Sequence, residues 1–74
     1  MAVMPYRVEI EREDGGRWLA EVIDLPGCMA YGATPEESLA RAQAVALRVL
    51  ADRLEHGEWP AGPVAVTLEA DTAA

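Results

Sequence analysis

The fold of this chain is decided by the stretch DLPGCMAYGATPEE at residues 24–37. Pro26-Gly27 breaks the segment that precedes it, because neither residue continues regular structure easily. Thr34 is a good N-cap, Pro35 suits the first helical position, and Glu37 completes a Thr-x-x-Glu capping box. The stretch therefore predicts extended structure before it and a helix after it.

Two alternating segments lie upstream. Tyr6, Val8 and Ile10 alternate with charged residues, which is typical of a half-buried strand. Asp14-Gly15-Gly16 predicts a hairpin turn, since Asp and Gly tolerate positive φ there, and residues 17–23 then form the return strand. Residues 28–31 predict a third short strand, antiparallel to the second. We expect residues 1–4 to be a frayed end.

The helix is expected from Pro35 to about His56, with Gly57 as its C-cap. At about 100° per residue, one apolar face gathers on its buried side. That predicted face consists of Leu39, Ala42, Ala46, Val49, Leu50 and Leu54. A flank of further apolar residues makes the apolar arc wide for a helix that lies on one sheet. This flank consists of Ala40, Ala44, Leu47 and Ala51. A connector at residues 58–63 leads to a last strand at residues 64–69, and residues 71–74 are expected to form a tail.

The predicted fold class is α+β with the order β-β-β-α-β. Three strands form an antiparallel meander, and the helix crosses over so that the fourth strand lies parallel to the first. One helix covers one face of four strands, so the other face stays open and carries Leu19 and Ile23. Beside them lies one of two pairs, Met29 with Tyr31 or Cys28 with Ala30. An open apolar face indicates a partner surface. We predict a homo-oligomer, a dimer or tetramer, that associates through Leu19, Ile23, Met29 and Tyr31.

Length and charge limit the function classes. The 74 residues make one domain, 1–74, with an ordered core at about 5–70. The net charge of −7, from 13 acids against 6 arginines, works against binding a nucleic-acid backbone and suits a basic partner. Cys28 is the single cysteine, which fits a reducing compartment, and there is neither a signal peptide nor a membrane-spanning run. We expect a cytoplasmic protein.

The residues that carry chemistry allow two readings. Glu9, Glu21 and Asp24 lie on neighbouring strands and could hold Mg²⁺ or act as acid and base. Alternatively Glu9 and Glu21 are solvent-facing residues in cross-strand charge pairs with Arg7 and Arg17. We favour the second interpretation, because no phosphate-binding loop, metal-ligand spacing or activated nucleophile accompanies them. No catalytic residue, cofactor or metal is predicted, and the chain is expected to be a binding module, not an enzyme.

Four segments resemble the HicB antitoxin family. They are YRVEI at 6–10, DGGRWLAEV at 14–22, DLPGC at 24–28 and the helix start GATPEESL at 32–39, followed by Ala42. The resemblance covers roughly residues 5–60. Its most specific part is Leu25-Pro26-Gly27-Cys28 at the right spacing from Gly32-x-Thr34-x-Glu36-Glu37. Ser38 replaces the family's usual Ala, and Ala33 replaces a commoner acidic or polar residue.

The resemblance implies a truncated ribonuclease-H-like domain without the nuclease's catalytic acids. Such domains neutralise HicA, a small basic toxin that degrades RNA, by binding it and covering its active site. Many relatives add a C-terminal DNA-binding segment, which we do not expect here, and no direct nucleic-acid binding by this chain alone is expected. Two alternatives stay open: a stand-alone HicB-like interaction module with an unknown partner, and a residual Mg²⁺-dependent nuclease.

The partner surface is predicted around the central turn and the nearby acids. The residues predicted to contact the partner are Glu21, Asp24, Leu25, Pro26, Gly27, Glu36 and Glu37. Loops on a rigid scaffold commonly carry such contacts. The alternative is that the turn serves conformation only and that the two helix-start acids serve as caps.

Overall fold

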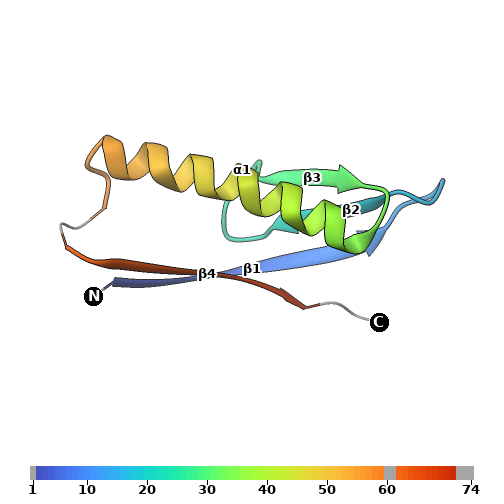
Figure 1. Cartoon of the computed structure of the whole chain (residues 1–74), viewed down its shortest axis with the longest axis horizontal. Helices are drawn as coiled ribbons and strands as arrows, with labels where there is room; N and C mark the ends of the chain where they lie inside the picture. The colour runs from blue at the N-terminus through green and yellow to red at the C-terminus, as the bar shows by residue number, and fades with distance from the viewer. Residues whose placement is uncertain (1, 60–61, 72–74) are drawn as a thin grey trace.

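One mixed sheet and one helix make up the computed structural model, which describes residues 2–59 and 62–71 (Figure 1). The elements are β1 (Ala2–Arg12), β2 (Trp18–Val22), β3 (Met29–Gly32), α1 (Pro35–Glu55) and β4 (Val64–Asp71). The sheet order is β3-β2-β1-β4, with β1 antiparallel to β2 and parallel to β4. The predicted α+β fold and the parallel last strand are confirmed.

Residues 1–4 were predicted to be a frayed end, and this is wrong for the residues that the structure describes. Val3 and Met4 belong to β1, where they pair with Ala65 and Val66 of β4 in the parallel ladder. A partner strand more than sixty positions away supplies the hydrogen bonds, and local alternation carries no sign of such a partner. Met1, residues 60–61 of the predicted connector and residues 72–74 of the predicted tail lie outside the described residues.

The two turns between the first three strands form where they were predicted. Gly15 and Gly16 have φ values of 91° and 88°, and the Glu13 N–H donates to the Arg17 carbonyl at 2.7 Å. Gly27 has a φ of 87° in the turn between β2 and β3. Positive φ explains why glycine occupies these positions. β2 is shorter than predicted, and β3 begins one residue later, at Met29.

The capping box at the helix start is confirmed. The Glu37 N–H donates to Thr34 Oγ1 at 3.1 Å, and Glu37 Oε1 accepts the Ala33 N–H at 3.1 Å. The first bond satisfies a backbone donor in the first turn of α1 that has no partner inside the helix, and the second ties the helix start to the residue before the N-cap. At the other end His56 is the C-cap, and Gly57 follows it with a φ of 70°. The helix limits were therefore predicted to within a residue.

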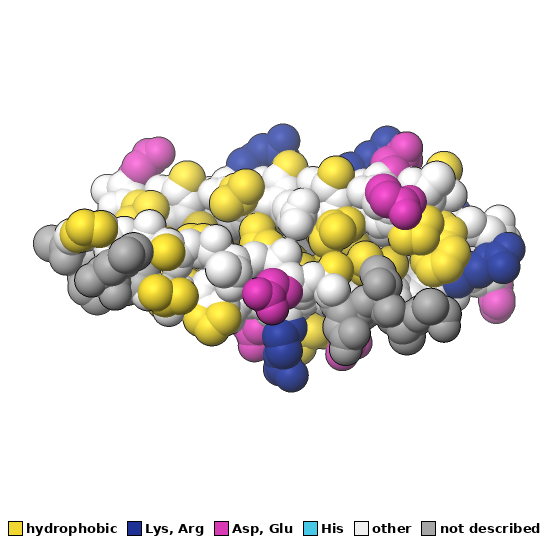
Figure 2. All heavy atoms as spheres, turned by 60° about the horizontal axis from the view of Figure 1, so that its bottom comes forward, with side chains coloured by type: hydrophobic (Ala, Val, Ile, Leu, Met, Phe, Trp, Pro, Cys, Tyr) yellow, Lys and Arg dark blue, Asp and Glu magenta, His cyan; other side chains and the backbone are white. Residues whose placement is uncertain are grey.

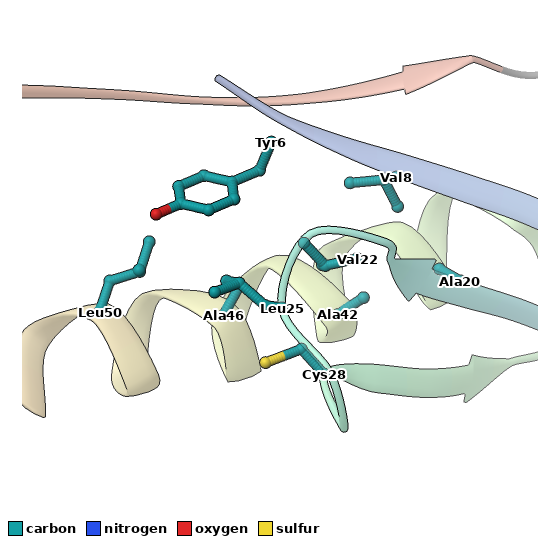
Figure 3. Packing of buried hydrophobic residues seen from close by; sticks show 9 residues of the cluster. All are labelled: Tyr6, Val8, Ala20, Val22, Leu25, Cys28, Ala42, Ala46 and Leu50. Atoms are coloured by element: carbon teal, nitrogen blue, oxygen red, sulfur yellow. The ribbon is translucent and has the colours of Figure 1, made fainter. Parts of the chain in front are cut away.

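The core lies between α1 and the face of the sheet that α1 covers (Figure 3). Side chains from β1, β2, the β2–β3 turn and α1 point toward one another there. They are Tyr6, Val8, Ala20, Val22, Leu25, Cys28, Ala42, Ala46 and Leu50. Ser38 is also fully buried, and its hydroxyl donates to the Pro35 carbonyl at 2.8 Å.

Leu54 was predicted in the buried face and is 46% exposed. The series Ala42, Ala46, Leu50, Leu54 turns about 40° around the helix at each four-residue step, because a turn takes 3.6 residues. Three such steps carry Leu54 out of the core. α1 also packs mainly on β2 and β3 and little on β1.

Candidate interaction surfaces

The face of the sheet opposite α1, called the outer face below, is open among the described residues. The strand register sets its side chains in rows. One row is Tyr31, Leu19 and Glu11, and the next contains Met29, Glu21 and Glu9. The third row is Ile23, Arg7 and Glu69. The Ile23 N–H donates to the Arg7 carbonyl, and Arg7 is paired with Glu69 in the parallel ladder. The outer face therefore combines apolar side chains on β2 and β3 with charges on β1 and β4.

The four residues predicted for self-association share this face. Met29 and Tyr31 are 43% and 40% exposed, while Leu19 and Ile23 are half-buried. Of the two pairs left open, Met29 with Tyr31 is the one on the outer face, because Cys28 is buried in the core and Ala30 packs against it. Association through these residues stays a prediction.

Carboxylates line the other half of the outer face. Glu9 lies directly opposite Glu21 across β1 and β2, so two like charges are neighbours. The predicted cross-strand charge pairs of Glu9 and Glu21 are not among the ion pairs of the described residues. Arg7 instead pairs with Asp24, at 3.7 Å from guanidinium to carboxylate. A hollow of about 410 Å³ beside these charges is lined by Arg7, Val8, Glu9, Glu69 and Ala70.

Asp24 has a structural role at the end of β2. Its Oδ2 accepts the Arg7 N–H at 2.9 Å, next to the bond between the Ile23 N–H and the Arg7 carbonyl. The carboxylate thus replaces a backbone acceptor at the point where β2 leaves β1. The Arg7 N–H of β1 therefore keeps a hydrogen-bond acceptor where the ladder between β1 and β2 ends.

The rest of the central turn is held by its own backbone and by one buried side chain. Leu25 is only 2% exposed, so its side chain packs in the core and is not available at the surface. Its N–H donates to the Val22 carbonyl and its carbonyl accepts the Cys28 N–H, both at 3.1 Å. Pro26 and Gly27 are exposed. Of the turn, these two residues and Asp24 present surface to a partner.

The predicted contact residues do not form one surface. The turn at Asp24 lies at one end of the short strand β3, and the helix start lies at the other end (Figure 1). Glu37 is engaged in the capping box and in an ion pair with Arg41 at 3.2 Å. Glu36 is exposed. Glu21 is half-buried in the middle of the outer face, between Met29 and Glu9.

The described residues contain no cluster of three or more His, Cys, Asp or Glu side chains that could hold a metal ion. Asp24, the third acid of the nuclease hypothesis, is turned to Arg7. Within the same part of the chain, no helix is both long and apolar enough to cross a membrane.

Comparison with known protein families, with curated proteins and with solved structures found no match.

Proposed function

We propose that this chain is a HicB-like antitoxin that acts in the cytoplasm by binding and masking a small basic, RNA-degrading toxin of the HicA type. The observation that carries the proposal is the outer face, on which carboxylates lie beside exposed Met29 and Tyr31. Aromatic and methionine side chains are enriched where proteins meet, and acids steer a basic protein toward them.

The arrangement suits masking and not catalysis. Glu9, Glu21 and Glu69 place negative charges on the outer face. A basic toxin would meet these carboxylates as it meets the phosphates of its RNA substrate. The ring of Tyr31 is stacked under the Arg17 guanidinium, whose carbon lies 4.2 Å from the ring centroid. A pre-oriented aromatic loses little conformational entropy when a partner covers it.

The test measures toxin activity directly. Any small basic protein encoded next to this chain is purified, and its cleavage of RNA is followed while this chain is added. We expect cleavage to stop at an equimolar ratio and the two proteins to co-elute. Absence of a complex with that neighbour would overturn the proposal and favour a stand-alone HicB-like interaction module.

A matched pair of variants locates the surface. Glu21→Lys, on the outer face, should weaken toxin binding by about tenfold or more, because it places a positive charge against a basic partner. Glu58→Lys makes the same change of charge in the exposed segment after α1 and should leave binding nearly unchanged. Equal effects of the two variants would mean that net charge alone governs the affinity. Glu21→Lys also relieves the repulsion with Glu9, so the variant should stay folded, and its circular dichroism spectrum checks this.

A further inference from the structure

A second apolar surface runs along α1, away from the core. It consists of Ala40, Ala44, Leu47, Ala51 and Leu54, called the helix seam below, and all five residues are exposed. Leu47 and Leu54 are 51% and 46% exposed, which is unusual for leucines on a helix that already buries another face. Gln43, which borders the seam, reaches the Leu68 carbonyl of β4, so the seam faces the β4 side of the molecule.

The seam is separate from the residues that hold the fold together. It is centred roughly 120° around the helix from Ala42, Ala46 and Leu50. Charged residues occupy the remaining side of α1; they are Glu37, Arg41, Arg48, Asp52 and Glu55. Figure 2 looks at the molecule from the side of β1 and β4, and hydrophobic side chains reach the surface along its whole length there. None of the five residues belongs to the core or packs against it, so the core does not account for the exposed Leu47 and Leu54.

The spacing of the seam identifies what can cover it. Its residues follow one another at intervals of four, three, four and three, the spacing of contact positions on a helix that packs along a second helix. Three of the five are alanines, which let two helix backbones come close. We propose that the helix seam binds the seam of a second copy of this chain, antiparallel and about a two-fold axis at Leu47.

Side-chain size favours the antiparallel copy. With the axis at Leu47, Leu54 of one chain lies opposite Ala40 of the other, and Ala44 lies opposite Ala51. Large side chains then meet small ones, and the contact is filled evenly. A parallel pair would set Leu54 against Leu54 at one end and Ala40 against Ala40 at the other, which leaves a gap. The same surface on both chains gives a closed dimer.

Charge along the seam is complementary in the same arrangement. Arg41, whose guanidinium also contacts Glu37 and the Tyr31 carbonyl of its own chain, comes within about 3 Å, measured along the helix axis, of the levels of Asp52 and Glu55 in the other chain. The Arg48 side chains of the two copies lie close to each other near the axis, and they form the one repulsive pair of this arrangement. On the outer face, by contrast, a two-fold copy would crowd the Glu9 and Glu21 of both chains together. The outer face therefore suits a basic partner. The helix seam suits a second copy, in place of the association first predicted through Leu19, Ile23, Met29 and Tyr31.

The experiment is a mass measurement by light scattering over a series of concentrations. The wild type should give about 16 kDa, twice the chain mass of 8.0 kDa, and Leu47→Glu should give the monomer with an unchanged circular dichroism spectrum. Leu19→Glu, its control on the outer face, should keep the dimer. A monomeric wild type, a dimeric Leu47→Glu protein or a monomeric Leu19→Glu protein would each overturn the proposal.

Two further variants test the geometry and do not depend on a disruptive charge. Arg48→Gln removes the repulsive pair and should tighten the dimer by about threefold or more. Leu47→Cys should form a disulfide-linked dimer under mild oxidation, because the two copies meet at the axis, while Cys28 is buried and stays free. Ala40→Cys should link only to Leu54→Cys and not to itself. Self-linking of Ala40→Cys would indicate a parallel pair and overturn the antiparallel arrangement.

Discussion

Gly32 and Ser38 lie against each other where β3 runs into α1. A Cβ built on Gly32 would be 2.5 Å from the backbone nitrogen of Ser38, closer than any real Cβ contact. Ser38 is fully buried, and its N–H donates to the Thr34 carbonyl at 3.0 Å. The first turn of the helix is thus packed directly on the strand backbone, with no side chain at Gly32 and a small one at Ser38.

Gly32→Ala should therefore destabilise the protein by about 1–3 kcal/mol or more, since the atom in the way is backbone and cannot rotate aside. Ser38→Ala is the control at the same contact: it loses one hydrogen bond and no space, and should cost about 1 kcal/mol or less. Denaturant unfolding followed by circular dichroism measures both. If Gly32→Ala costs no more than Ser38→Ala, the close approach is not a constraint on the fold.

Asp24 should stabilise the fold mainly through the backbone of Arg7. Asp24→Ala leaves the Arg7 N–H without its acceptor and should lower the free energy of unfolding by about 1–2 kcal/mol. Arg7→Gln removes only the ion pair, whose guanidinium side chain is 77% exposed, and should cost less than about 0.5 kcal/mol. Equal losses for the two variants would show that the ion pair, and not the backbone bond, accounts for the role of Asp24.

Glu21→Gln should raise stability, although it removes a predicted contact residue. Glu9 and Glu21 are directly opposed, and like charges in that position are destabilising, so neutralising one should contribute about 0.3–1 kcal/mol. The gain should shrink at high salt, because the repulsion is screened. Thermal unfolding at low and high salt measures this. A salt-independent gain would point to a cause other than repulsion.

The topology could be predicted from the sequence because turn, break and capping residues mark the ends of the strands and of the helix. The Asp14-Gly15-Gly16 turn, the Pro26-Gly27 break and the Thr34 cap all act within a few residues, and all three are where they were expected. A single helix after a meander leaves few ways to place a last strand, so the parallel pairing of β4 was predictable as well.

The errors come from features that are not local. The pairing of Met4 with Val66 depends on a distant strand, and the exposure of Leu54 depends on where the sheet ends under α1. Leu25 was predicted as a contact residue because it lies in an exposed type of turn, but its side chain is in the core. The helix seam was visible as a wide apolar arc; only the structure shows that the arc contains two separate faces.

Each of the two edge strands has one carbonyl that accepts a hydrogen bond from a side chain of α1. Arg41 donates to the Tyr31 carbonyl of β3 at 2.9 Å, and Gln43 donates to the Leu68 carbonyl of β4 at 3.4 Å. β3 and β4 are the outermost strands of the sheet, where free backbone groups invite pairing with another chain. Replacing both donors, as Arg41→Met with Gln43→Leu, should speed aggregation on heating several-fold while lowering the free energy of unfolding by no more than about 2 kcal/mol. Arg12→Met removes the same charge at an exposed position of β1 and serves as the control. Turbidity and thioflavin fluorescence at matched unfolded fractions measure the difference. If the double variant and the control aggregate alike, the two side chains do not protect the edges.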